Sequence, residues 1–299
     1  MPYAARQGGS ASSDDLILSV SVGAGGTIAG ADVLRVQKAL NKVPKEFGGP
    51  LPLLVEDAQA GKKTIGAISD FQQRHFGFKD GRVNVLGKTH AKLSSLQPNK
   101  LKRMRTGQSF LSQARDCMLA AQAGLTAAGV ELLTGGGFLG TRNLDLADKH
   151  FDIRKSPDPA RALVQVGSIF SIMLSVFARP GGLWGWSAFE AEPFTNPTFY
   201  AFTFCGGFTL GGIYFGCLRM DTVYLSAFYD HSTPDNRIQT IVHELSHFVG
   251  PVSGGNIDDY AYGQQSDPNM KALSPHQKQH NAESFGNYAF EAKFGRFPQ

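Results

Sequence analysis

Apolar residues recur at helical spacing in several separate stretches of this chain. The clearest stretch lies near the C-terminus and has Ile238, Ile241, Val242, Leu245 and Val249 on one face. Thr233 can cap this helix, and Pro234 suits its first position because a proline there gives up only an N–H that lacks a partner anyway. The pattern therefore predicts an amphipathic helix that begins at Pro234 and buries one face.

Three shorter helices are expected near the N-terminus, at 32–41, 64–75 and 89–93. Their buried sides carry Val33, Val36 and Leu40 in the first helix and Ile65, Ile68 and Phe71 in the second. Asp80-Gly81 marks a turn before the third. Residues 14–97 are therefore predicted to form a small helical domain.

The next segment, 98–108, is rich in Lys and Arg and is predicted to be an exposed basic linker between two domains. Two long helices are expected after it, at 109–133 and 159–178. The first has Leu111, Ala114, Met118, Ala121, Leu125 and Val130 on its apolar face. The apolar run at 162–178 is short for a membrane span and is interrupted by polar residues, so we expect a core helix and no membrane span.

From residue 198 the pattern changes to strands and turns. Stretches 198–205, 212–217 and 222–228 are rich in aromatic and β-branched residues and are separated by glycine pairs. Helices followed by a block of strands indicate an α+β fold. The expected organisation is a flexible tail at 1–13, the helical domain at 14–97, the linker at 98–108 and a larger domain at 109–299.

The helix at 234 carries the chemistry that stands out in this chain. His243 and His247 are four residues apart, so their side chains lie on the same face and can hold one Zn²⁺. Glu244 follows the first histidine and is the candidate general base that takes a proton from a water molecule at the metal. The arrangement His-Glu-x-x-His therefore predicts a catalytic zinc site.

A catalytic zinc usually takes three protein ligands, and the third is open from the residues alone. A further histidine six residues past His247 is excluded, because Ser253 stands there. Asp259 follows a stretch rich in glycine that can turn the chain back to the metal. Glu283, on a helix expected further on, is the alternative, because a glutamate from a later helix completes some other zinc peptidases.

The residues His243–Phe248, Asp258–Gly263 and Asn281–Glu283 together resemble the deuterolysin group of zinc endopeptidases, the aspzincins, and especially its peptidyl-lysine branch. The resemblance implies a zincin-like catalytic domain in which Asp259 is the third ligand and Tyr262 faces the transition state. Asn256 and Ile257 stand where the family has Gly-Thr. The likeness is strong over the last seventy residues and weak before them.

The same resemblance implies a role in substrate binding for Glu283. In the lysine-specific branch, an acid at this position helps to hold a basic side chain just after the scissile bond. Those enzymes place a second acid directly before the Asn-Ala step, where this chain has His280. One carboxylate beside a histidine attracts lysine less strongly than two carboxylates do, so strict lysine specificity is not expected.

Residues 14–97 resemble the three-helix peptidoglycan-binding domain found beside many cell-wall hydrolases. The likeness is carried by Val33–Asn41, Ala67–Phe78 and Asp80–Val83, while a long loop at 43–61 and Asn84-Val85-Leu86 depart from that pattern. The resemblance implies peptidoglycan as a partner of this domain. Such domains also serve as structural adaptors, so both roles stay open.

Composition and charge narrow the classes of function. The chain has 299 residues, 42% of them hydrophobic and 18% charged, which is a globular composition. Its net charge of +4 is mild, and it has no basic patch interleaved with aromatics, so nucleic acid is not an expected partner. Of three cysteines, Cys205 and Cys217 are the pair that can form a disulfide, since they lie on adjacent predicted strands.

Three functions follow from this reading. The first is a zinc endopeptidase acting on proteins or peptides; the second is a peptidoglycan stem-peptide endopeptidase; the third is a non-catalytic wall-binding protein that contains zinc. Glu244 argues against the third, because a structural zinc site needs no general base. No secretory signal peptide is visible in residues 1–13, so we expect either export by another route or a signal outside this sequence. Export by another route would fit a secreted effector or toxin that acts outside the producing cell or in a target cell's envelope, with a secretion machine and an inhibitor or immunity protein as partners.

Overall fold

The computed structural model describes residues 16–136, 140–177, 188–191, 201–202, 208–210, 213–215, 222–225, 227–247 and 256–299. The chain folds into two compact units, with a boundary between Arg105 and Thr106. The expected tail at 1–13 and the expected Cys205–Cys217 disulfide lie outside the described residues.

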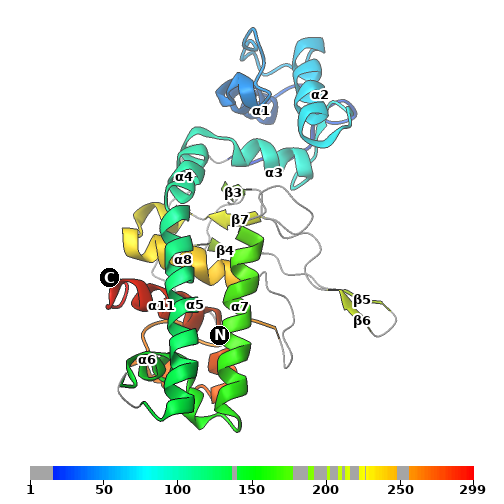
Figure 1. Cartoon of the computed structure of the whole chain (residues 1–299). Coiled ribbons are helices and arrows are strands. Elements are labelled where there is room, and N and C mark those ends of the chain that lie inside the picture. The colour runs from blue at the N-terminus through cyan, green and yellow to red at the C-terminus, as the bar shows by residue number, and fades with distance from the viewer. Residues whose placement is uncertain are drawn as a thin grey trace. The chain divides into compact units, whose positions relative to one another are not determined.

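The N-terminal unit contains the three helices that the sequence predicts (Figure 1). They are α1 (Ala31–Lys42), α2 (Lys62–Phe76) and α3 (Lys88–Ser95), joined by the short antiparallel pair β1 (Val22–Gly23) and β2 (Arg82–Val83) and a 3₁₀ turn, η1 (Lys45–Phe47). Val33, Val36 and Phe71 are fully buried, as their spacing predicts. Ile65 is only half-buried, at the edge of this core.

The predicted basic linker is wrong in its local structure. Residues Pro98–Ser109 form helix α4, and Leu101, Lys100 and Arg103 on it are at most 7% exposed. Lys100 donates a hydrogen bond from Nζ to Ser94 Oγ, 2.9 Å away. A basic stretch in a sequence suggests solvated side chains. Long basic side chains can, however, bury their methylene stems while the head group binds a polar partner.

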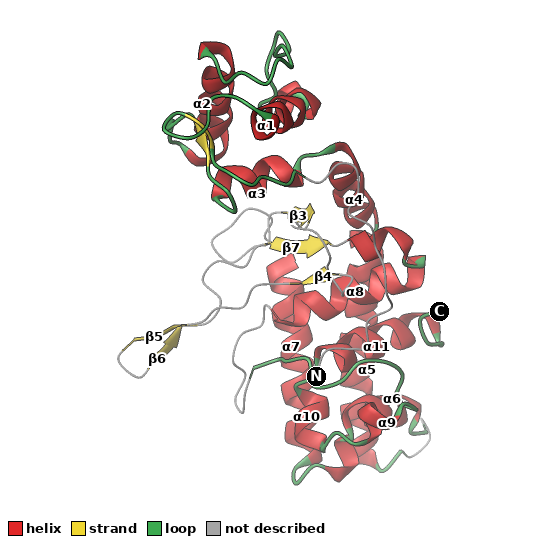
Figure 2. Cartoon of the chain, turned by 180° about the vertical axis from the view of Figure 1, so that it is seen from behind, coloured by secondary structure: helices red, strands yellow, loops and turns green. Residues whose placement is uncertain are grey.

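The C-terminal unit is built on long helices (Figures 1 and 2). In chain order they are α5 (Leu111–Thr134), α6 (Arg142–Phe151), η3 (Ile153–Lys155), α7 (Pro159–Phe177), η4 (Ala227–His231), α8 (Pro234–His247), α9 (Pro268–Lys271), α10 (Pro275–Gln279) and α11 (Ala282–Phe294). The helices α5 and α7 match the predicted ones, and α6 was not predicted. Gly135, in the left-handed conformation at φ 62°, ends α5 as its glycines suggested.

One residue of the predicted apolar face of α5 is misplaced. Ala114, Met118, Ala121 and Leu125 are buried, but Val130 is 45% exposed. A step of five residues from Leu125 turns away from the buried face, and Ala128 lies on that face instead.

The described strands are short. They form a three-stranded sheet in the order β3 (Ala188–Ala191), β7 (Thr222–Leu225), β4 (Ala201–Phe202), and a separate antiparallel hairpin of β5 (Phe208–Leu210) and β6 (Ile213–Phe215). The strand β7 pairs antiparallel with β4, with Leu225 opposite Ala201. Helices with a small sheet confirm the predicted α+β class.

The helices α8 and α11 pack against each other and lie across α5 (Figures 1 and 2). Gly286 on α11 makes the close approach possible, because a Cβ there would lie 2.8 Å from Gln239 Nε2 and 3.1 Å from its carbonyl oxygen. Phe285, Tyr288 and Ala289 of α11 are fully buried in the core that also takes Ile241 of α8. This packing brings the start of α11 beside the two histidines.

Residues 98–134, which comprise α4 and α5, are long and apolar enough by composition to cross a membrane. Core helices of globular domains meet the same criterion, and one face of α5 is packed in the core described above. Helix α7, which contains most of the apolar run at 162–178, buries Val166, Ile169, Phe170 and Met173.

Candidate metal centre

Helix α8 begins as the sequence predicts. The backbone N–H of Asn236 donates to Thr233 Oγ1 over 3.2 Å, which is the N-cap bond, and Pro234 takes the first helical position. Ile238, Ile241, Val242 and Leu245 are at most 3% exposed, while Val249 lies outside the described residues. Burying this face fixes the rotation of the helix about its axis, and so fixes where His243 and His247 point.

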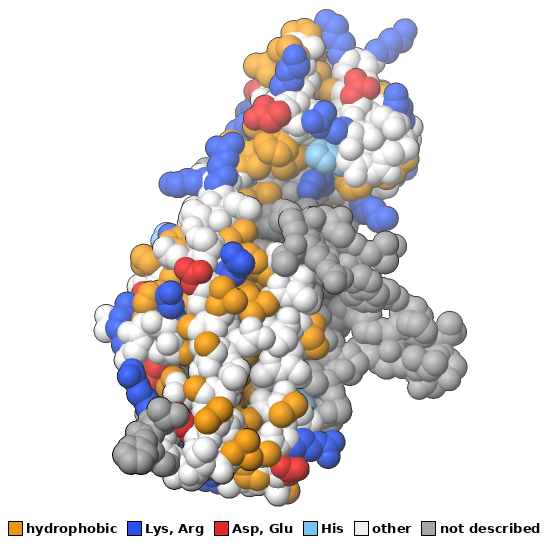
Figure 3. All heavy atoms as spheres, in the orientation of Figure 1, with side chains coloured by type: hydrophobic (Ala, Val, Ile, Leu, Met, Phe, Trp, Pro, Cys, Tyr) orange, Lys and Arg blue, Asp and Glu red, His pale blue; other side chains and the backbone are white. Residues whose placement is uncertain are grey.

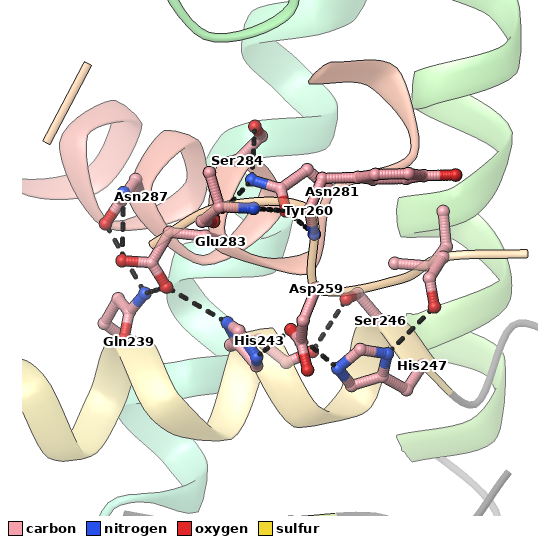
Figure 4. A network of polar contacts seen from close by, with 12 residues as sticks. Gln239, His243, Ser246, His247, Asp259, Tyr260, Asn281, Glu283, Ser284 and Asn287 are labelled. Carbon is pink, nitrogen blue, oxygen red and sulfur yellow. Dashed lines mark hydrogen bonds and ion pairs between the residues drawn. The ribbon is translucent and has the colours of Figure 1, made fainter. Parts of the chain in front are cut away.

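Three side chains meet beside α8 (Figure 4). His243, His247 and Asp259 each offer one ligand atom, and the three atoms lie within 4.8 Å of one another. The Oδ1 atom of Asp259 is 3.0 Å from His243 Nε2 and 3.4 Å from His247 Nε2. The two histidine side chains are 7% and 13% exposed, and that of Asp259 is 39% exposed. The group is therefore anchored in the protein and open on the aspartate side.

The donor set fits a zinc ion. Zinc prefers imidazole nitrogen and carboxylate oxygen at about 2.0–2.2 Å, and around a tetrahedral ion such ligand atoms are about 3.3 Å apart. The observed separations of 3.0 and 3.4 Å are close to that value. Three protein ligands leave a fourth position for water or substrate, which is the pattern of catalytic rather than structural sites.

The remaining ring nitrogen of each histidine has its own acceptor. Nδ1 of His247 lies 2.9 Å from the carbonyl oxygen of Ile257, and Nδ1 of His243 lies 3.1 Å from Glu283 Oε2. Because a carbonyl and a carboxylate can only accept, each Nδ1 carries the proton and each Nε2 is turned to the metal position. Such partners fix ring orientation in metal sites.

The two candidates for the third ligand lie on opposite sides of His243. Asp259 lies on the Nε2 side of both histidines, and Glu283 lies on the opposite, Nδ1 side of His243. Among the described residues, Asp259 is the acid that completes the group.

Asp259 belongs to a segment that is held by the start of α11. Asn281, which is fully buried, accepts at Oδ1 from the backbone N–H groups of Tyr260 (2.9 Å) and Ala261 (3.2 Å), and it donates from Nδ2 to the Ala261 carbonyl (2.9 Å). The backbone of Asp258 adds two bonds, from its N–H to the His280 carbonyl and to its carbonyl from the Ala282 N–H. The segment that carries Asp259 and Tyr262 is thus bound along its length.

Gly263 ends this segment in a conformation that suits glycine. Its φ is +102°, and a Cβ would lie 2.1 Å from Asp267 Oδ2. Its N–H donates to Glu283 Oε1 over 3.1 Å, and its carbonyl accepts from Asn287 Nδ2 over 2.9 Å. The position after Tyr262 is therefore also fixed on α11.

Tyr262 lies beside His243, and Glu244 is buried on the same helix as the two histidines. The Tyr262 ring stacks on the His243 ring with centroids 5.7 Å apart and planes 14° apart, and it is 39% exposed. Burial, followed by the nearby charge of Asp259, raises the pKa of the Tyr262 hydroxyl, so it stays protonated and can donate. Glu244 is 5% exposed, and its charge acts on both histidines and on Tyr262.

The electrostatics of the group favour a cation at its centre. Burial lowers the pKa of His243, but hydrogen bonds with Asp259 and Glu283 outweigh burial and raise this pKa well above its ordinary value. Burial raises the pKa of Asp259, and hydrogen bonds from His243 and His247 outweigh it and hold the pKa well below the usual range. A metal ion that binds here displaces a proton, so uptake is coupled to pH.

Asn281, Asn287 and Gln239 were not identified from the sequence as residues of the site. Asn281 is part of a sequence motif, but no spacing rule connects it with residues 260 and 261, which lie 21 and 20 positions earlier. A buried asparagine just before a helix that follows a catalytic segment is the signal that suggests such a clamp.

Part of the chain is similar to a known family. Residues 217–290, which include the three ligand candidates, match the model of the aspzincin family, described as lysine-specific metallo-endopeptidase. A zinc peptidase from Grifola frondosa is similar in structure over 61% of this chain and 95% of its own, at 19% identity and a TM-score of 0.38. A search of curated proteins finds no match.

The match covers the described metal group and the two helices that build it, α8 and most of α11. The donor set is one that zinc prefers, and it leaves a position open for the reacting groups. This chain is a zinc metalloendopeptidase, with Zn²⁺ as its cofactor.

Proposed function

We propose that His243, His247 and Asp259 hold the zinc and that Glu244 and Tyr262 carry out the proton transfer and charge stabilisation of peptide hydrolysis. The observation that carries this proposal is the convergence of one atom from each of the three ligand residues within 4.8 Å, beside the Tyr262 ring. The buried Glu244 follows the first ligand on the same helix.

Zinc supplies polarisation of the scissile carbonyl and a water molecule of lowered pKa. Glu244 accepts a proton from the attacking water and returns it to the leaving amine. Tyr262 donates a hydrogen bond from its hydroxyl to the oxygen on which negative charge develops. The high pKa of Tyr262 supports this role, because an ionised phenol cannot donate.

Lysine selectivity is a separate proposal. The matched family is described as lysine-specific, but His280 stands directly before Asn281 and offers no negative charge to a substrate cation. Burial lowers the pKa of His280, and its Nδ1 lies 2.8 Å from the His276 carbonyl. We therefore propose a protein or peptide substrate with at most a weak preference for lysine.

The N-terminal unit supports a second candidate, cleavage of peptidoglycan stem peptides. This unit is compact and contains three helices, and residues 16–105 contain 15 Lys and Arg against 6 Asp and Glu. Figure 3 shows many of these cations on one face of the unit. We propose that it targets an anionic cell envelope, as a wall-binding domain of a secreted effector.

Release of peptides from casein and from purified sacculi, measured side by side, tests the two substrates. Glu244→Gln is the control, and it should lower kcat by about 10²–10⁴-fold on the true substrate, because the base is lost while the fold is kept. Activity that survives in this variant would contradict the assignment of the base. Sedimentation of the full chain with sacculi, compared with a Lys38→Glu, Lys42→Glu double variant on the exposed side of α1, tests the targeting.

A further inference from the structure

The carboxylate of Glu283 has four hydrogen-bond partners, and all four are donors (Figure 4). Oε2 accepts from Gln239 Nε2 at 2.9 Å and from His243 Nδ1 at 3.1 Å. Oε1 accepts from the Gly263 N–H at 3.1 Å and from Asn287 Nδ2 at 3.4 Å. The side chain is 13% exposed.

An ionised carboxylate has about four lone-pair positions, and the four donors are directed at them, three within 3.1 Å and Asn287 Nδ2 at a longer 3.4 Å. A substrate lysine would be a fifth donor, and it would have to displace one of them. One of these donors, His243 Nδ1, belongs to a proposed metal ligand. These contacts are therefore those of a structural anchor rather than of an open specificity pocket.

The four donors come from three different parts of the chain. Gln239 and His243 are on α8, Gly263 ends the segment with Asp259 and Tyr262, and Asn287 is on α11 itself. One side chain thus joins the helix that holds two ligands to the segment that holds the third. Displacing it would move His243 and Tyr262 together.

We propose that Glu283 is a positioning residue that sets the orientation of His243 and the place of Tyr262, and that it does not bind the substrate's basic side chain. This inference rests on the proposed zinc ligands and goes beyond them, because it assigns the residue that links helix α8 to the segment with Asp259 and Tyr262.

Glu283→Gln is the sharpest test. The amide has the same shape but only one accepting atom, so it cannot satisfy the donors on both sides. If its oxygen faces His243, its NH₂ group opposes the Gly263 N–H, and the reverse orientation opposes His243 Nδ1. Loss of an outer partner of a zinc-bound histidine typically costs about 10–100-fold in metal affinity.

The expected result is a 10–100-fold loss of zinc affinity for Glu283→Gln, measured by competition with a chromophoric chelator. The visible spectrum of the Co²⁺-loaded protein should change as well, because His243 is turned. The rate should fall equally for peptides with lysine and with leucine after the scissile bond. Glu291→Gln is the matched control, since it makes the same change two turns further along α11, beside His150 and Lys149, and should leave zinc affinity unchanged.

The opposite pattern would overturn the proposal: unchanged zinc affinity and Co²⁺ spectrum, with KM raised only for the lysine peptide. If the wild-type chain itself binds no zinc, the proposed zinc site has failed instead, and the two failures are distinguishable. Should Glu283→Gln not fold, Glu283→Asp decides. That variant keeps the charge one methylene further back, and wild-type zinc affinity in it would equally overturn the positioning role.

Discussion

Replacing Asn281 by alanine should open the segment that carries Asp259 while leaving the helices folded. The change removes three hydrogen bonds to the backbone of residues 260 and 261. Tyr260 is 41% exposed and can turn its N–H to water, but Ala261 is only 7% exposed. Two buried backbone groups are then left unsatisfied at about 1–3 kcal/mol each, or about 2–6 kcal/mol together.

The segment can avoid that penalty by moving away from α11. When the segment opens, the protein avoids most of the loss of folding free energy. The substitution then weakens zinc binding and does not unfold the whole chain. If the open form is favoured by about 2 kcal/mol, zinc affinity falls about 30-fold, because only the closed form brings Asp259 to the histidines. Chelator competition measures the Kd for zinc, and hydrogen exchange of the Ala261 amide measures how often the segment opens.

Two further variants sharpen the experiment. Asn281→Asp keeps the acceptor but places a second acceptor opposite the Ala261 carbonyl, so it should be nearly as damaging as alanine. Asn269→Ala changes an exposed asparagine on α9 and should have no effect on zinc binding. Zinc affinity and Ala261 exchange both unchanged in Asn281→Ala would refute the clamp.

Asp259→Ala should lose zinc and turnover together, because the two histidines alone do not complete the site; metal content by atomic absorption checks this, and retained zinc would contradict it. Gly263→Ala should lower the melting temperature and kcat, since its Cβ would lie 2.1 Å from Asp267 Oδ2 at a φ of +102°; an unchanged kcat would contradict a fixed segment. Burial raises the pKa of Glu291, but hydrogen bonds from His150 and a lysine outweigh it and lower this pKa to about 2. Glu291 therefore adds at most about 3 kcal/mol to the free energy of unfolding, in full above the unfolded pKa of about 4.3, and this contribution is lost as the pH falls to about 2. Denaturant unfolding of the wild type and of Glu291→Gln at each pH should show a difference in the free energy of unfolding that shrinks over this range.

Helix α8 could be predicted because its signals are local. Its cap, its first proline and its apolar spacing all lie between Thr233 and Val249, and each acts through contacts between near neighbours. The pair of histidines one turn apart follows directly from the helix. The third ligand needed the likeness to a family, because nothing within the segment near Asp259 states which acid faces the metal.

The network around α11 could not be predicted, since it depends on packing between distant parts of the chain. Glu283 accepts hydrogen bonds from Gln239 and His243, which lie 44 and 40 positions earlier in the sequence. These residues come within hydrogen-bond distance only when α8 packs on α11. Periodicity predicts that such helices exist but not their crossing or their register. The resemblance suggests a role in substrate binding for Glu283, and its contact with His243 Nδ1 is visible only in the fold.

The same limit explains the misread junction at 98–108. Its cations were counted as solvated because sequence shows charge but not the partner. Lys100 has Ser94 as its acceptor within the N-terminal unit, and the residues around it are helical. A charged stretch is exposed only where the fold leaves it without such contacts.

The packing of α8 on α11 and the binding of zinc must influence each other. Gln239 is at the contact with Gly286, and it also donates to Glu283, which in turn accepts from the zinc-facing His243. A ligand that binds the folded form stabilises it, so zinc should strengthen this helix contact. By the same linkage, a side chain added at Gly286 would push Gln239 and weaken zinc binding without touching a ligand. The close approach of two helices is therefore part of what determines the affinity of the metal site.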